Sequence, residues 1–123
     1  MSENKALKND QEKPRMDLVP AGAVIETAKV FTFGAKKYAD NNWRKGFKYS
    51  RLIAALERHI AAFKEGEDID PESGLPHMAH ASCCVMMLIE HQLKGYGQDD
   101  RYMKDEKSPK VSEKLTNMVR PYY

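Results

Sequence analysis

Three segments of this 123-residue chain repeat apolar side chains at the three- and four-residue spacing of an α-helix. The segments are 20–34, 50–66 and 76–94; each begins at a proline or a serine and ends at or next to a glycine. Those residue types suit the first turn, the N-cap and the end of a helix. No segment alternates apolar and polar residues with the period of a β-strand. The pattern therefore predicts an all-α fold.

The same spacing predicts which face of each helix is buried. In chain order, the expected stripes are Ala23, Val24, Thr27, Ala28, Val30 and Phe31; Leu52, Ile53, Leu56, Ile60 and Phe63; and Met78, Ala81, Val85, Leu88 and Ile89. The third helix is apolar on more than one face, which is typical of a helix buried from several sides. Three helices also give a modest core for this length. We therefore expect a helical bundle completed by oligomerisation, as a homodimer or a homotetramer.

The ends of the chain differ from its middle in composition. Residues 1–16 are polar and without periodicity, which predicts a flexible arm. Residues 17–97 should form one helical domain that carries the site, because a chain of this length is the size of one domain. Residues 98–123 are mostly charged and predict a tail. Within it, 111–119 could form a short helix or an arm that becomes ordered on a neighbouring subunit.

The overall charge and the cysteines exclude several classes of protein. Twenty basic and eighteen acidic residues give a net charge of +2, which is not the balance of a general nucleic-acid or membrane-surface binder. No apolar run approaches the roughly 20 residues of a membrane-spanning helix, and the first seventeen residues do not resemble a signal peptide. Cys83 and Cys84 are adjacent, so we interpret them as small core residues rather than as a disulfide. A reducing, cytoplasmic location fits this usage.

Two segments concentrate charge of opposite sign. Segment 34–51 contains six basic residues and one acidic residue, whereas segment 65–72 contains five acidic residues and no basic residue. One interpretation is a pair of solvated loops that attract each other. The other is a site that needs both signs, with cations for phosphate oxygens and carboxylates for a divalent metal ion.

The histidines and acids around the second loop suggest a metal site. All four histidines lie on the second and third predicted helices, and His77 and His80 are neighbours on one helical face. If these helices pack antiparallel, two or three of the loop acids can converge with His77. The candidate ligands of Mg²⁺ or Mn²⁺ are Glu67, Asp70, Glu72, His77 and His80. The alternative is a set of ordinary polar residues satisfied within the core.

The basic segment mixes cations with aromatic and amide side chains. Lys36 and Lys37 could neutralise a polyphosphate, Tyr38 or Trp43 could stack on a base, and Asn42 could hydrogen-bond its edge. The alternative is ordinary packing of the aromatic side chains between helices. Both interpretations stay open at this point.

Four sequence blocks resemble the N-terminal family of phage and prophage dATP/dGTP diphosphohydrolases. They are KPRMDLVP (13–20), FGAKKYADNNWRKG (33–46), LERHIAAFKEGEDIDPESGLPHMAHA (56–81) and the apolar helix that follows. Because this family is related to MazG-like all-α nucleoside triphosphate pyrophosphohydrolases, the resemblance implies a helical, oligomeric enzyme that depends on Mg²⁺ or Mn²⁺. The implied substrate is a purine deoxynucleoside triphosphate, hydrolysed to the monophosphate and pyrophosphate. The implied location is the host cytoplasm if a phage encodes the chain.

The resemblance also implies roles for individual residues. Glu67 or His59 would orient the attacking water or accept its proton. Lys36, Lys37 and Arg58 would offset negative charge on the triphosphate. Where MazG-like enzymes carry acidic motifs on neighbouring helices, this chain has Arg58-His59, Glu67 with Asp70, and His77-x-x-His80. This difference leaves a second hypothesis open, in which the protein binds and sequesters a nucleotide without cleaving it.

The first block adds one more pair. Arg15 and Asp17 could form an ion pair that orders the N-terminal arm over the site, or a simple surface pair that contributes under about 1 kcal/mol.

Overall fold

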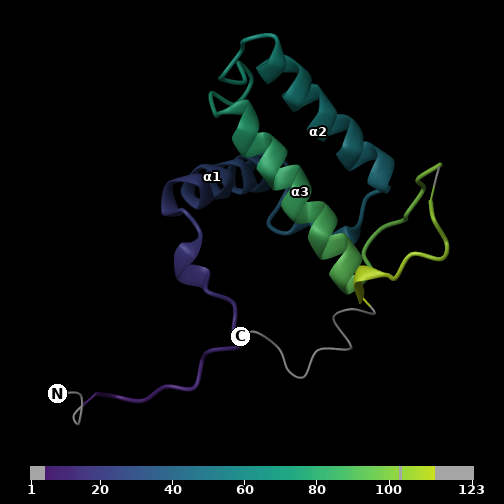
Figure 1. The fold of residues 1–123 in the computed structure, drawn as a ribbon. Coiled ribbons are helices and arrows are strands. Elements are labelled where there is room, and N and C mark those ends of the chain that lie inside the picture. The colour runs from purple at the N-terminus through teal and green to yellow at the C-terminus, as the bar shows by residue number, and fades with distance from the viewer. Residues whose placement is uncertain (1–4, 103, 113–123) are drawn as a thin grey trace.

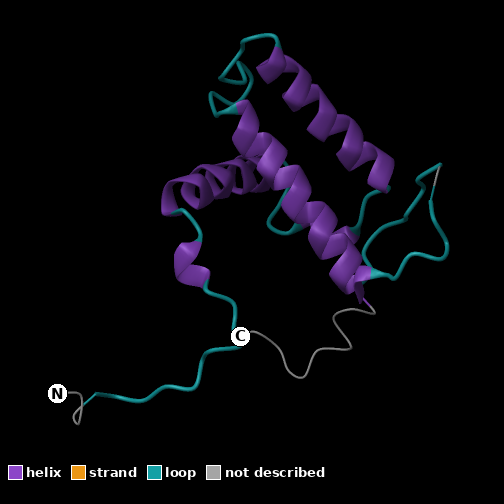
Figure 2. Ribbon diagram, viewed as in Figure 1, coloured by secondary structure: helices purple, strands orange, loops and turns teal. Residues whose placement is uncertain are grey.

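The computed structural model describes residues 5–102 and 104–112, and within them the chain forms three α-helices (Figure 1). Helix α1 spans Ala21–Lys37, α2 spans Tyr49–Lys64 and α3 spans His77–Lys94. Two short 3-10 helices span Met16–Leu18 and Asn42–Lys45. The described residues contain no β-strand (Figure 2), so the predicted all-α fold is confirmed for this part of the chain.

Helix α3 is the centre of the arrangement. It packs against both α1 and α2. Helix α2 runs antiparallel beside it, and α1 crosses it at a steep angle (Figure 1). The loop between α2 and α3 is closed by a bridge between Ile69 and Pro76, and a second bridge joins Lys48 to Gln98 beyond the end of α3. The two loops that carry the charged segments are therefore both anchored close to α3.

The helix ends differ from the sequence prediction in two places. Helix α1 continues through Gly34 to Lys37, because the alanine and lysines after the glycine are good helix formers. Helix α2 begins at Tyr49, and Ser50 is not its N-cap. Instead, the N–H and the hydroxyl of Ser50 donate hydrogen bonds of 2.9 and 2.6 Å to the carboxylate of Asp100. The capping group thus comes from a residue 50 positions later in the sequence.

The core consists largely of small side chains. Val30, Ala79 and Cys83 form its buried centre, and Phe31, Leu75 and Met87 pack around them. Cys83 and Cys84 are buried and unbonded, which confirms their interpretation as core residues. The buried residues of α3 include four small ones, Ala79, Ala81, Cys83 and Cys84.

The predicted buried stripes were only partly correct. The stripe residues that are exposed in the structure are Ala23, Val24, Ala28, Ile60, Phe63, Met78, Val85 and Ile89. In a single chain, α1 and α2 cover only part of the surface of α3, and α3 covers only one side of each of them. Spacing alone could not show which apolar face is turned inward, because α3 is apolar on several faces.

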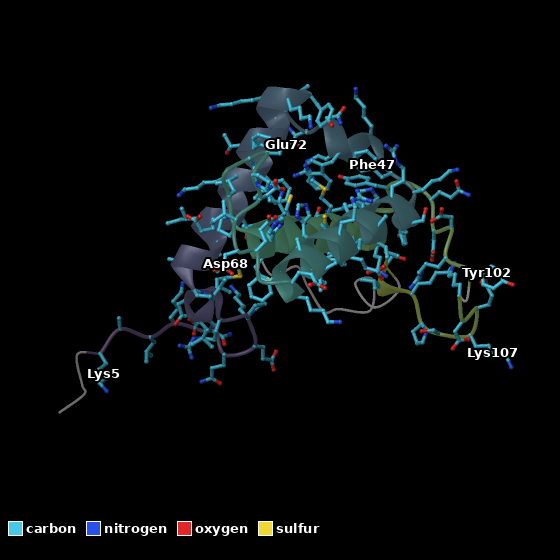
Figure 3. The ribbon with its side chains drawn as sticks, turned by 90° about the horizontal axis from the view of Figure 1, so that it is seen from above. Lys5, Phe47, Asp68, Glu72, Tyr102 and Lys107 are labelled. Carbon is cyan, nitrogen blue, oxygen red and sulfur yellow. The ribbon has the colours of Figure 1, made fainter. Side chains whose placement is uncertain are left out.

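The N-terminal end of the chain contributes little to the packed helices. Residues 5–15 contain no helix and are exposed, and Lys5 lies well away from α1 (Figure 3). The short helix predicted at 111–119 falls mostly on residues outside those described. None of the helices in the described ranges is long and apolar enough to cross a membrane.

Candidate metal and nucleotide site

A cleft of about 1130 Å³ is bordered by all three helices and by the loops that connect them. Its polar and aromatic lining includes Lys37, Tyr38, Asn42, Trp43, Arg44, Arg58, His59, Asp70, Glu72, His77 and His80. Residues from both charged segments therefore border one cavity. In Figure 3, Glu72 and Phe47 mark its two connecting loops and lie on the same side of the helices.

Three side chains in this cleft converge well enough to hold a cation. One ligand atom from each of His59, Asp70 and His77 lies within 4.8 Å of the other two. Nδ1 of His59 is 2.9 Å from Nδ1 of His77 and 3.8 Å from Oδ2 of Asp70. The three residues come from α2, from the α2–α3 loop and from the first position of α3. The converging group thus includes His59, which the sequence suggested only as a catalytic residue.

The α2–α3 loop fixes two of these ligands through its own backbone. The N–H of Asp70 donates to the carbonyl of Leu75 at 2.9 Å, and the N–H of His77 donates to the carbonyl of Asp68 at 2.9 Å. Oδ1 of Asp70 accepts the N–H of Glu72 at 2.8 Å, which leaves Oδ2 facing the histidines. Gly74 completes the turn with a φ of 73°, a conformation that glycine adopts without strain.

His80 lies beside this group. Its ring stacks on that of His59, with centroids 4.4 Å apart and planes within 10°. Its Nε2 is 2.6 Å from Oγ of Ser73 and 3.7 Å from Oδ2 of Asp70. His80 is therefore a neighbour of the converging set, held by a hydroxyl of the loop.

Glu67 has a different position from the one predicted. Its Oε1 lies 2.6 Å from Nε2 of His77, on the opposite edge of that ring from His59. Glu67 does not line the cleft, and its side chain is 54% exposed. The structure therefore places it against a candidate ligand rather than among the atoms that converge.

Burial and nearby polar groups shift the pKa values of three residues in the site. It lowers the pKa of His59 and also that of His80, because the charged imidazolium is less well solvated there. Burial alone would raise the pKa of Asp70, but the hydrogen bond from Glu72 N–H and the nearby histidines outweigh it, and the net pKa is lowered. At neutral pH the imidazoles of His59 and His80 are therefore neutral and Asp70 is ionised. For His59 and Asp70 this is the state that binds a cation.

The predicted phosphate-binding lysines separate in the structure. Lys37 lines the cleft, and its Nζ lies 2.9 Å from Oε1 of Glu72. Lys36 is exposed and does not line the cleft. Glu72 is thus an ion-pair partner of Lys37 and is not in the converging group. Arg58, the third cation predicted to bind phosphate, lines the same cavity as Lys37.

The aromatic residues divide between rim and core. Tyr38 lines the cleft with two-thirds of its surface exposed, which leaves its ring accessible. Trp43 packs against Phe31 at 5.9 Å, stacks on His91 at 6.1 Å and carries the Arg44 guanidinium over its ring at 4.4 Å. Packing between helices therefore accounts for most of the Trp43 surface, although Trp43 also lines the cleft.

Sequence reasoning missed the residue that fixes this aromatic loop. His91 is fully buried. Its Nε2 accepts the N–H of Phe47 at 3.0 Å and its Nδ1 donates to the carbonyl of Met87 at 2.7 Å. Gly97 allows the close approach, because a Cβ there would collide with the backbone oxygen of Phe47. A histidine far along an apolar helix was the only sequence signal of this role.

The Arg15–Asp17 pair forms, but not over the cleft. Two hydrogen bonds of 2.8 and 2.7 Å join the side chains, both of which are exposed. Neither residue lines the cavity. The structure therefore supports the surface ion pair rather than an ordered lid.

The fold and the cleft define a class: a helical protein with a histidine- and carboxylate-lined cavity that is bordered by cationic and aromatic side chains. More specifically, the chain belongs to the dATP/dGTP diphosphohydrolase N-terminal family, whose sequence profile matches residues 3–101. It is similar to the dATP/dGTP diphosphohydrolase of Salmonella phage PMBT28, with 37% identity over 83 residues. That match covers 68% of this chain but only 28% of the phage protein, so the chain spans less than a third of its relative. No solved structure matches.

Proposed function

We propose that this chain hydrolyses purine deoxynucleoside triphosphates, dGTP or dATP, to the monophosphate and pyrophosphate with the help of a divalent metal ion. The main support is the cleft, in which the group His59, Asp70 and His77 shares one cavity with Lys37 and Arg58. A triphosphate requires both a metal site and cationic side chains to offset its charge. The name of the phage relative supports the same chemistry.

The chemistry of the donor set indicates which metal ion fits. Mn²⁺ accepts both imidazole and carboxylate ligands, whereas Mg²⁺ prefers oxygen ligands and binds imidazole poorly. His59, Asp70 and His77 would hold the ion. When bound, it would supply positive charge to the phosphate oxygens and lower the pKa of a water molecule.

The remaining side chains bind and orient the triphosphate. Arg58 lines the cleft and is exposed, so its guanidinium can contact phosphate oxygens. Lys37 must exchange Glu72 for phosphate, at a small cost, because an exposed ion pair contributes under about 1 kcal/mol. His80 lies at the edge of the metal group, where its imidazole can hydrogen-bond a water molecule or a phosphate oxygen.

The nucleoside would occupy the rim formed by the basic segment. The exposed ring of Tyr38 offers a stacking surface, and Asn42 lines the cleft with an amide that can hydrogen-bond a base edge. Trp43 also lines the cleft at this rim. A purine presents a larger stacking face than a pyrimidine, which is consistent with a preference for dGTP and dATP.

The direct test is incubation of the purified full chain with dGTP, dATP, dCTP or dTTP and Mn²⁺. We expect monophosphate and pyrophosphate from the purine nucleotides, and loss of turnover in Asp70→Asn. The folded, metal-loaded protein should be confirmed by circular dichroism and metal analysis. Absence of turnover with all four nucleotides would overturn the enzymatic proposal.

A second candidate is a nucleotide-binding protein that does not cleave its ligand. It is favoured by the presence of a single carboxylate among the three converging ligands of the described residues. Calorimetry with dGTP separates the two candidates. Tight binding followed by recovery of unchanged dGTP would support sequestration.

We also propose that the chain forms a homo-oligomer. Ile60, Phe63, Val85 and Ile89 expose apolar surface on α2 and α3, which a second copy would cover. Light scattering at micromolar concentration should give a dimer or tetramer mass, and a monomer mass would contradict this.

A further inference from the structure

The contact between Glu67 and His77 determines which nitrogen of the imidazole is available. Oε1 of Glu67 lies 2.6 Å from Nε2 of His77. An ionised carboxylate can only accept a hydrogen bond, so Nε2 must carry the proton. A neutral His77 ring then has its lone pair on Nδ1.

That lone pair is directed at the second histidine of the group. Nδ1 of His77 lies 2.9 Å from Nδ1 of His59, and His77 is almost completely buried. Two ligand atoms bound to one ion at about 2.1 Å, and at right angles to each other, lie about 3 Å apart. In the metal-free chain this contact is an N–H···N hydrogen bond, and the separation of the two nitrogens also matches that of neighbouring ligands on a transition-metal ion.

Glu67 is itself held in place at the end of α2. Its backbone N–H donates to the carbonyl of Ala62 at 3.0 Å, which ties it to the last turn of that helix. From there the carboxylate reaches the outer edge of the His77 ring, while Asp70 approaches from the inner side. Glu67 and Asp70 thus have separate roles.

We propose that His59, Asp70 and His77 select a first-row transition-metal ion over Mg²⁺, and that Glu67 is a positioning residue that holds His77 in the Nε2–H tautomer. This inference rests on the metal site of the proposed function, and it adds the class of ion and a role for Glu67 other than ligand or base. Carboxylates that orient a ligating histidine typically raise metal affinity 10- to 100-fold.

The test uses the full chain, stripped with a chelator and titrated with Co²⁺, Mn²⁺ or Mg²⁺ in the absence of nucleotide. Calorimetry gives the affinity and stoichiometry, and the visible absorption of bound Co²⁺ reports its ligands. We expect one Co²⁺ per chain, bound at least about 100-fold more tightly than Mg²⁺. Equal or tighter binding of Mg²⁺ would overturn the proposed selectivity.

The variants separate the positioning role from that of a ligand. Glu67→Ala should weaken Co²⁺ binding about 10- to 100-fold with an unchanged Co²⁺ spectrum, and Glu67→Gln, which retains an acceptor oxygen, should recover part of the loss. Asp70→Ala should alter the spectrum as well as the affinity. Glu65→Ala, an exposed acid of the same loop, is the matched control and should change neither.

Each result has a defined meaning. A spectral change in Glu67→Ala would make Glu67 a ligand and overturn its positioning role, as would an affinity equal to that of Glu65→Ala. Circular dichroism of the metal-free variants verifies folding, and Glu67→Gln replaces Glu67→Ala if the latter does not fold. Selective Co²⁺ binding without dNTP turnover would support this inference and overturn the proposed hydrolysis. Conversely, dNTP turnover by a chain that binds Mg²⁺ as tightly as Co²⁺ would support the proposed hydrolysis and overturn this inference.

Discussion

The backbone N–H of Phe47 donates a hydrogen bond to Nε2 of His91, a residue 44 positions later on α3. Because the other ring nitrogen donates to the Met87 carbonyl, both hydrogen bonds require a neutral imidazole with its proton on Nδ1. The ring also stacks against Phe47 and Trp43. One buried side chain therefore fixes the loop that forms the rim of the cleft.

We expect His91→Phe to destabilise the protein by about 2–3 kcal/mol, since it retains an aromatic ring but leaves the Phe47 N–H without its acceptor. Urea unfolding followed by tryptophan fluorescence measures this directly, because Trp43 contacts His91. Glu57→Gln, at an exposed position of α2, is the control and should change stability by less than about 0.5 kcal/mol. A similarly small effect of His91→Phe would show that the hydrogen bond does not fix the loop.

The stability of the metal-free protein should fall as the pH is lowered. Burial lowers the pKa values of His59 and His80 in the folded chain, whereas these histidines have an ordinary pKa of about 6.5 in the unfolded chain. Below that pH the unfolded chain therefore binds more protons than the folded chain. Stability is fully present above that pH and declines toward the lowered folded-state pKa values. Urea unfolding in EDTA between about pH 8 and pH 5 checks this. The double variant His59→Asn/His80→Asn should show a shallower decline, and an unchanged slope would contradict the assignment.

The adjacent thiols should be unreactive in the native protein. Burial raises the pKa of Cys83 to about 12 and also raises that of Cys84, so little thiolate forms at pH 8. A disulfide reagent such as Ellman's should label neither cysteine within minutes, and should label both in 6 M guanidinium. Lys64→Cys supplies an exposed thiol as a positive control. Rapid native labelling of two thiols would show that the core around α3 opens readily.

Removal of the carboxylate of Glu72 should strengthen nucleotide binding. Glu72→Gln releases Lys37 for phosphate, so KM for dGTP should fall about 2- to 5-fold, whereas Lys37→Gln should raise it. Mn²⁺ affinity should stay the same in both variants, since neither side chain is in the converging group. Loss of Mn²⁺ affinity in Glu72→Gln would instead support the sequence-based interpretation of Glu72 as a ligand.

The helices and the meeting of the two charged segments could be predicted from the sequence. Apolar spacing located α1, α2 and α3, and the antiparallel packing of α2 and α3 follows from the short loop between them. The residue types from Asp70 to Gly74 favour a turn, and there the N–H of Gly74 donates to the carbonyl of Asp70 at 2.7 Å. The helices and the turn depend on residues close together in the chain, where local preferences decide the structure, and the packing of α1 and α2 on α3 then brings the two charged segments together.

Which residues of the site converge on one point, and which lie outside that group, could not be predicted from the sequence. Whether Glu67 or Asp70 faces the histidines depends on the direction in which each side chain leaves a turn, and Lys36 and Lys37 point differently although they are neighbours. Serine is a residue type that favours the N-cap, yet in this structure the side chain of Asp100 accepts the hydrogen bonds at the start of α2. Each of these outcomes is set by a tertiary contact that has no local sequence signature.

The hydrogen bonds of Asp100 at the start of α2 couple the local unfolding of two segments that are distant in the sequence. The chain leaves α3, and within six residues of its end it returns to hold the first turn of α2, directly after the loop that carries Trp43. The rim of the cleft and the segment after α3 are thus expected to lose their order together, as one cooperative unit. A shortened chain that ends before Asp100 would expose the first turn of α2 to fraying, and with it the wall against which a nucleotide base would rest.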